Sequence, residues 1–378
     1  MNALFALALI LGAIPGAAAQ KAATGAATAP QVEKLTQDGK ADEAMEKGRT
    51  AVAAHPDDVD LRLALARALA AKARKVNRVL DMTMSQKDID RGELKLEGVD
   101  LGAAKRRVDY DTGLFEEAIL HLESGIKRAP QREDLRVLLC FLLTDAGSID
   151  RAKAAIAGAL VALPKTPALA KTMTDYGAER AKRGDPAGGA ALLAPVASAF
   201  PKDAAILVDY ANVLTRLGRK SEAYAAFDRV TELAPREVRY ARTKAVGAML
   251  MRDYRRARTA FDAAFRLGHG AADQFASYAA AYGVDPKGSA ELMGELAVPA
   301  AASDPSMTDL ADAFARAGKA GAASKDAMTL ARTLLNSQQF VFAIPVLDRA
   351  IQSNPKNVEA KTMLKTAFRE LGCEPLAK

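Results

Sequence analysis

The chain has 378 residues, of which 53 are lysine or arginine and 46 are aspartate or glutamate, so its formal net charge is +7. Only two cysteines are present, which excludes a disulfide-rich scaffold. A moderately basic surface favours acidic proteins, anionic lipid heads or wall polymers as partners. No nucleic-acid partner is expected, because the sequence has no aromatic-basic platform of the kind that single strands need.

The amino-terminal residues have the pattern of a secretory signal. An apolar run over residues 3–14 is followed by a small-residue site that ends at Ala19, and the run is too short for an ordinary membrane span. We therefore expect residues 1–19 to be a signal peptide, residues 20–30 to be a flexible linker, and the mature protein to be periplasmic. Membrane association would come only through a partner or an uncleaved signal.

Five points in the middle of the chain lie one repeat apart. Pro130 and Pro164 are 34 residues apart, as are Pro201 and Pro235, and His269 lies 34 residues beyond Pro235. A fixed period of this length marks a stack of helical hairpins.

The same residue types recur inside each repeat when positions are counted from the third residue after the proline. Small residues at positions 20 and 27 let helices approach closely, and a bulky residue at position 24 fills the remaining space. Glycine at position 15 suits the left-handed turn that ends the first helix. The residues are Ala152, Ala223 and Ala257 at position 20, Ile156, Phe227 and Phe261 at position 24, Ala159, Val230 and Ala264 at position 27, and Gly147 and Gly218 at position 15.

This pattern resembles the tetratricopeptide-repeat family over nearly the whole mature chain. The resemblance implies an all-α solenoid of about seven helical hairpins, wound as a right-handed superhelix. The register extends back to Gly39 and Pro56 and forward to Pro355. Residues 358–371 then predict an amphipathic helix that caps the solenoid at its carboxyl end.

The predicted array, residues 31–269, is interrupted once. Pro56 and Pro130 are 74 residues apart, more than twice the period. We therefore expect an insertion at about residues 74–111, with basic clusters near its ends and an acidic stretch between them. It is either a helix extension with a solvated flap or a lid or docking arm, and the residues leave both readings open.

A second break covers residues 270–323, which we interpret as a degenerate helical repeat region. Residues 270–283 predict a first helix, residues 289–297 a short second helix, and residues 303–318 a further single helix. The last repeat and the capping helix follow over residues 324–378.

No catalytic, cofactor-binding or metal-binding residue is predicted, and we do not expect an enzyme. His55, His121 and His269 lack metal-ligand spacing and have no evident nucleophile beside them. Cys140 and Cys373 lie several repeats apart, and stacked repeats touch only their neighbours, so a disulfide is not expected.

Two charged stretches have structural explanations. Residues 109–113 resemble the start of a calcium loop, but capping of a helix by Asp111 or Thr112 explains them better. The arginines of the run 252–258 are expected mainly to line a solvated second helix.

The family resemblance also implies that first helices line the groove of the superhelix at positions near 2, 5, 9, 12 and 13. An asparagine there could bond to the backbone of an extended peptide, and arginines could bind its carboxylates. A merely solvated helix face is the alternative. The predicted partner-binding residues are Lys171, Asp175, Asn212, Arg216, Arg239 and Arg242.

The sequence thus predicts a non-enzymatic scaffold or assembly factor of the bacterial cell envelope that binds a protein or peptide, acidic ones included, in this groove. One alternative is a periplasmic carrier of a lipid or other apolar small molecule, enclosed by the superhelix and the insertion. Another is an enzyme, or an accessory domain of one, that uses the acidic residues of the insertion.

Overall fold

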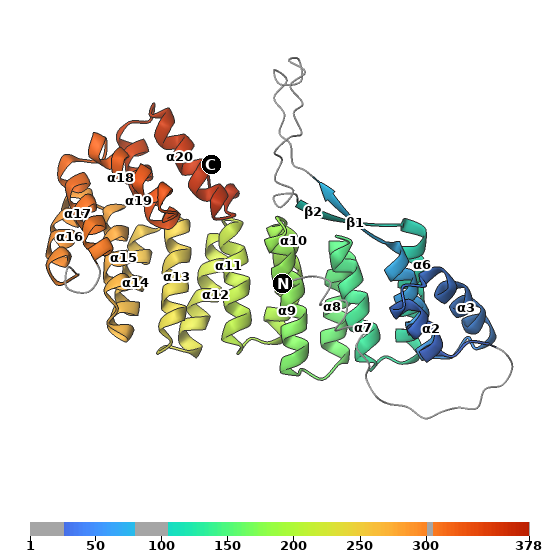
Figure 1. Cartoon of the computed structure of the whole chain (residues 1–378). Helices are drawn as coiled ribbons and strands as arrows, with labels where there is room; N and C mark the ends of the chain where they lie inside the picture. The colour runs from blue at the N-terminus through green and yellow to red at the C-terminus, as the bar shows by residue number, and fades with distance from the viewer. Residues whose placement is uncertain (1–25, 80–104, 301–304, 378) are drawn as a thin grey trace, which may run out of the picture. The chain divides into compact units, whose positions relative to one another are not determined.

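The computed structural model describes residues 26–79, 105–300 and 305–377. The expected signal peptide and the acidic stretch of the insertion lie outside these residues. The chain folds into two compact units, Met1–Lys165 (unit 1) and Thr166–Lys378 (unit 2). Both units are built mainly from paired α-helices (Figure 1).

The described part of unit 1 forms three helix pairs around a leucine-rich core. Leu65, Leu69 and Leu122 are among its fully buried side chains. In chain order the pairs are α2 (Ala29–Gln37) with α3 (Ala41–Ala54), α4 (Val59–Ala73) with α6 (Thr112–Arg128), and α7 (Glu133–Asp145) with α8 (Ile149–Ala162).

Unit 2 continues the pairing and adds single helices. Its elements are α9 (Pro167–Lys182), α10 (Pro186–Ala199), α11 (Ala204–Arg216), α12 (Lys220–Leu233), α13 (Val238–Leu250), α14 (Tyr254–Gly268), α15 (Ala271–Tyr282), α16 (Pro286–Ala300), α17 (Pro305–Ala320), α18 (Lys325–Asn336), α19 (Phe340–Ser353), α20 (Val358–Glu370) and the 3₁₀ turn η2 (Glu374–Ala377). Taken in chain order these helices form pairs, except for α17, which packs against the completed pair at α16, and α20, which packs against α19. The described residues thus form eight pairs, one more than the seven or so expected, because the degenerate region contributes the complete pair α15–α16.

The repeat positions have the packing roles that their residue types predict. Ala152, Ile156 and Ala159, at positions 20, 24 and 27 of one repeat, are all fully buried. Gly147 and Gly218 end their turns with φ of 76° and 71°, a left-handed backbone that a side chain disfavours. These short-range requirements explain why the repeat can be recognised in the sequence.

The insertion begins as a β-ribbon, so the helix extension considered from the sequence is wrong. Helix α4 ends at Ala73, and β1 (Arg74–Val79) pairs antiparallel with β2 (Lys105–Tyr110). The amide of Asp111 donates to the carbonyl of Ala73 at 2.9 Å, which closes the base of the ribbon. The Asp111 side chain then accepts from the Leu114 amide at 3.1 Å, so the predicted capping of α6 is confirmed.

The degenerate region differs from its prediction in the lengths of two helices. Helix α16 begins at Pro286 rather than residue 289, and α17 continues past Gly318 to Ala320. Gly318 therefore lies inside α17 and does not end it. A Cβ atom at this position would clash with the carbonyl oxygen of Pro286 on α16. The glycine instead permits close contact between α16 and α17.

The carboxyl-terminal helices of unit 2 contact more than their sequence neighbours. Helix α19 packs against α13 and α15, and η2 packs against α11 (Figure 1). The expectation that repeats touch only their neighbours is therefore wrong for this unit. Helix α20 covers the end of the array with Leu364 and Phe368 buried.

Candidate functional site

The first helices α9 and α11 of unit 2 place five polar residues on one surface, which we call the α9–α11 face. Lys171 and Asp175 lie one turn apart on α9, while Asp209, Asn212 and Arg216 follow at helical spacing on α11. The two helices contact each other, and the charges of Lys171 and Asp175 act on the carboxyl group of Asp209. Four of the six residues predicted from the sequence thus share one surface.

Lys171 and Asp175 form an exposed ion pair. Lys171 Nζ lies 2.5 Å from Asp175 Oδ2, and the side chains are 75% and 59% exposed. Such pairs contribute little to stability, because water screens them and both side chains lose rotamer freedom. A ligand can therefore exchange for either partner at small cost.

Asp209 is a member of this face that the sequence analysis missed. Its side chain is half-buried, and among the described residues no donor hydrogen-bonds to its carboxylate. Burial is the largest influence on its pKa and raises it, while the charges of Lys182 and Lys171 act in the opposite direction. The sequence does contain one signal for Asp209, which is a carboxylate among the otherwise apolar residues 206–210. Its repeat position was not among those expected to line the groove.

The two arginines of α13 have different surroundings. Arg242 donates to both carboxylate oxygens of Asp273 on α15 at 2.6 and 2.7 Å, and the Asp273 side chain is 5% exposed. This bidentate pair joins two first helices. Arg239 is 71% exposed, stacks over the Tyr240 ring at 4.5 Å and lies 3.4 Å from Glu237.

An open pocket of about 550 Å³ adjoins Arg239. It is lined by residues 199–205 and by Tyr240, the ring on which Arg239 stacks. Arg239 therefore lies beside a depression between the amino end of α11 and α13, whereas Arg242 is held in a contact between helices.

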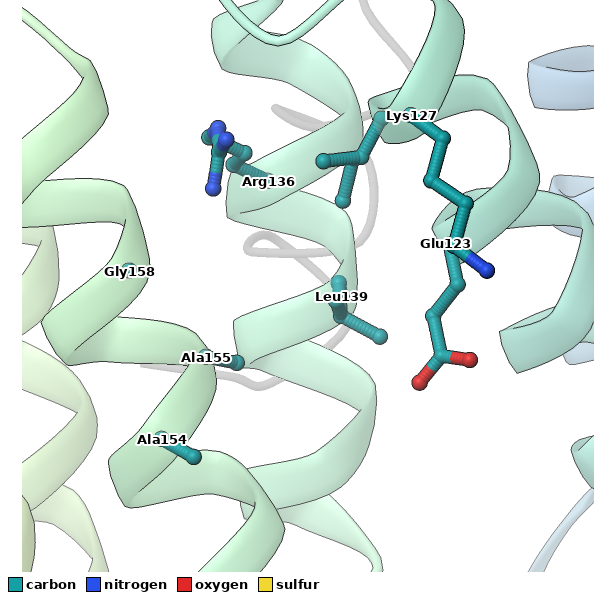
Figure 2. A pocket seen from close by; sticks show the side chains of 8 residues that line it. Glu123, Lys127, Arg136, Leu139, Ala154, Ala155 and Gly158 are labelled. Carbon is teal, nitrogen blue, oxygen red and sulfur yellow. The ribbon is translucent and has the colours of Figure 1, made fainter.

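Unit 1 has a smaller pocket of about 260 Å³ among α6, α7 and α8 (Figure 2). Leu139 of α7 lies between the small side chains of α8 and the charged side chains of α6. The volume of this pocket is just below the usual range for small-molecule sites, about 300–1,000 Å³. The lining residues are Glu123, Ile126, Lys127, Arg136, Leu139, Ala154, Ala155 and Gly158.

The titratable groups away from these surfaces have structural surroundings. Burial raises the pKa of the Cys140 thiol to about 12, which keeps it protonated at neutral pH. Burial, and then the charge of Arg62, lowers the pKa of His121. Among the described residues, no cluster of three or more His, Cys, Asp or Glu side chains could hold a metal ion. No described helix has the length and apolar character needed to cross a bilayer.

Three solved structures illustrate what the chain is similar to. PilW, a type IV pilus biogenesis factor, is 18% identical over 52% of this chain and 90% of its own, with a TM-score of 0.34. YrrB, a tetratricopeptide-repeat protein with an unusual peptide-binding site, is 13% identical over 58% and 92%, with a TM-score of 0.30. MamA from MSR-1 is 23% identical over 42% and 89%, with a TM-score of 0.27. Comparison with curated proteins finds no match.

The family assignment rests on the sequence itself. The tetratricopeptide repeat family model matches residues 110–176 and 180–246, which run from the end of β2 into α13. The helix pairs, left-handed turns and buried small residues recur in the same register. The chain therefore contains tetratricopeptide repeats over residues 110–176 and 180–246.

Proposed function

We propose that this chain is a non-enzymatic scaffold of the bacterial cell envelope that binds a protein or peptide on the α9–α11 face. The observation that carries the proposal is the grouping of Lys171, Asp175, Asp209, Asn212 and Arg216 on two adjacent first helices. Tetratricopeptide proteins commonly act as binding scaffolds, because stacked repeats present a long surface.

The chemistry of this face suits an extended polypeptide. The Asn212 amide can donate to and accept from a peptide backbone, and Arg216 can bind a carboxylate through two parallel hydrogen bonds. Asp209 offers acceptor oxygens that no described donor occupies. Mixed charge favours recognition of a polar sequence over simple attraction to any acidic molecule.

Arg239 extends the proposed surface along α13, because its side chain is exposed and borders the open pocket beside Tyr240. Arg242 is a poor probe of binding. Its removal would leave the buried carboxylate of Asp273 without its guanidinium partner and so disturb the fold.

Location in the envelope is the second part of the proposal. Its support is the signal-like pattern of residues 1–19. Fractionation of cells that express the full chain tests it, and recovery of uncleaved protein from the cytoplasm alone would contradict it.

The binding test is affinity capture from a native envelope fraction, comparing wild type with the double variant Asn212→Ala, Arg216→Ala. Arg229→Ala on α12 is the matched control, since that side chain is exposed and pairs only within its own helix. We expect a specific protein to be lost from the double variant and kept by the control. An unchanged set of captured proteins would contradict binding on the α9–α11 face. Lipid captured without protein would favour the carrier alternative.

A further inference from the structure

Arginine at position 252 does not suit its place in the repeat, although its backbone does. It occupies position 15 of its repeat, where Gly147 and Gly218 stand in other repeats, and it has a φ of 58°. Left-handed backbone is unfavourable for a residue with a Cβ atom. Such a conformation persists where surrounding contacts compensate for it.

The Arg252 side chain supplies those contacts by reaching three carboxyl-terminal elements. Nη2 donates to the carbonyl oxygen of Leu376 in η2 at 2.9 Å. The guanidinium lies over the Phe368 ring of α20 at 5.2 Å, and Nε lies 3.6 Å from Asp348 Oδ1 of α19. One turn of the array therefore holds elements that come about a hundred residues later in the chain.

Two further contacts fix α19 but do not reach the end of the chain. The Tyr254 hydroxyl donates to Asp348, and Arg349 donates to the carbonyl oxygens of Gly283 and Val284 after α15. Helix α19 is thus held at several points.

The residues that follow α20 fold back onto earlier helices of the unit, where Leu376 and Ala377 pack against the core that contains Cys373. We call residues 371–377 the C-terminal segment. Leu376 lies against the turn after α11, where a Cβ atom on Gly218 would be 3.1 Å from its Cδ2. Leu376 and Ala377 are only partly buried, whereas Cys373 is 1% exposed. The bond from Arg252 to Leu376 joins this segment to a turn of the preceding repeats.

The C-terminal segment also borders the α9–α11 face. A Cβ atom on Gly372 would lie 4.0 Å from Nη1 of Arg216. An aliphatic side chain against a helix end and a carbonyl bonded to arginine are contacts that a bound peptide makes. Here the chain supplies the peptide itself.

We propose that the C-terminal segment is a releasable ligand of its own unit, filling a peptide-docking surface made by the turn at Gly218 and by Arg252. The surface would take a partner peptide with an aliphatic side chain and a free backbone carbonyl once the segment leaves. This inference deepens the proposed function by assigning a second surface next to the α9–α11 face, and its test does not depend on capture of a partner.

Cys373 provides the probe, because release of the segment exposes its thiol. The rate of modification by Ellman's reagent is measured on the full chain, with Cys140 of unit 1 as internal reference and peptide mass spectrometry to separate the two sites. The first variant is Arg252→Gly, since glycine accepts the left-handed backbone and removes only the side-chain contacts. Loss of a charge-assisted hydrogen bond should speed modification of Cys373 by about tenfold or more.

Gln338→Gly is the matched control, because Gln338 occupies position 15 of the last repeat with a φ of 59° and an exposed side chain. It should leave the Cys373 rate unchanged. Leu376→Asp, close to the chain end, should raise the rate without unfolding the repeats. Equal Cys373 rates in wild type, Arg252→Gly and Leu376→Asp would overturn the proposal.

A synthetic peptide tests the docking surface directly. It has the sequence of residues 371–377 with serine in place of cysteine and is added to the wild-type chain. Competition for the surface should raise the Cys373 rate to a plateau with peptide concentration, and a peptide with aspartate in place of the leucine at 376 should not. No response to the first peptide would reduce the contact to a structural latch and refute the docking surface, even if partner capture by the α9–α11 face succeeds.

Discussion

The ribbon of unit 1 and the carboxyl-terminal helices of unit 2 both depart from simple stacking of hairpins, and each is anchored by an aspartate, an arginine and a tyrosine. At the ribbon, Asp145 of α7 accepts from Arg74 Nε at 2.8 Å and from the Tyr110 hydroxyl at 2.9 Å. The side chains of Asp145 and Arg74 are 2% and 11% exposed. This is a short, buried, charge-assisted contact.

In unit 2 the same three residue types are distributed the other way round between the repeat and the segment that packs on it. The aspartate, Asp348, lies on the carboxyl-terminal helix α19, whereas Arg252 lies in the turn before α14 and Tyr254 is the first residue of α14. The arginine contact is looser, since Arg252 Nε is 3.6 Å from Asp348 and the Arg252 side chain is 28% exposed. The difference indicates a permanent anchor for the ribbon, whereas the arginine contact to α19 is longer and more exposed.

The largest effect is expected from Asp145→Ala. This change leaves the buried guanidinium of Arg74 without its carboxylate, and breaking a buried pair typically costs about 3–5 kcal/mol. We expect a loss of this size in the protection of α7 amides against hydrogen exchange, which measures the stability of unit 1. Asp150→Ala, an exposed carboxylate on α8, is the control. Comparable protection in both variants would contradict the permanent anchor.

Asp348→Ala should have the smaller effect of the two. The variant loses the bond from Tyr254, while Arg252 can still donate to Leu376, so we expect a loss of about 1.5–3 kcal/mol in the stability of unit 2. Thermal unfolding and hydrogen exchange of α19 measure it. A larger loss than for Asp145→Ala would reverse the ranking of the two anchors.

The packing of the two units can be compared at a shared repeat position. Ala159 in unit 1 and Ala264 in unit 2 both occupy position 27 and are fully buried. Leucine at either site should overpack a helix contact and cost about 1–3 kcal/mol, measured by the melting temperature. Unchanged melting in both variants would mean that the register assigned to the repeats is wrong.

The smallest effect is expected from Asp209→Asn. Because the pKa of Asp209 is raised in the folded state, mainly by burial, its contribution to stability is present at low pH and is lost as pH rises through the folded pKa. The variant should therefore melt slightly higher than wild type at neutral pH, and the difference should shrink on acidification. It should also bind partner less well, since a functional site often trades stability for binding. A variant less stable at neutral pH would show that Asp209 has a structural role.

Arg252 shows where interpretation of the sequence reached its limit. The run 252–258 was expected mainly to line a solvated second helix, and Arg255, Arg256 and Arg258 on α14 are indeed exposed. Arg252 instead lies in the turn before that helix and bonds to Leu376, 124 residues later. No local pattern encodes a partner at that distance.

The candidate site divides in the same way. Lys171, Asp175, Asn212 and Arg216 could be predicted because helical spacing within one repeat places them on a face. Asp209 could not, since its importance comes from half-burial between neighbouring charges. Nor could the binding of Arg242 to Asp273, which depends on how α13 and α15 approach each other.

By itself the sequence determined the all-α repeat, its turns and its small-residue core, because a hairpin is a local structure whose requirements return every 34 residues. Tertiary structure alone decided that the insertion begins as a ribbon pinned at Asp145 and that the chain end returns to α11. Both rest on long-range contacts, whose free energy depends on burial and geometry that appear only when distant segments have packed together.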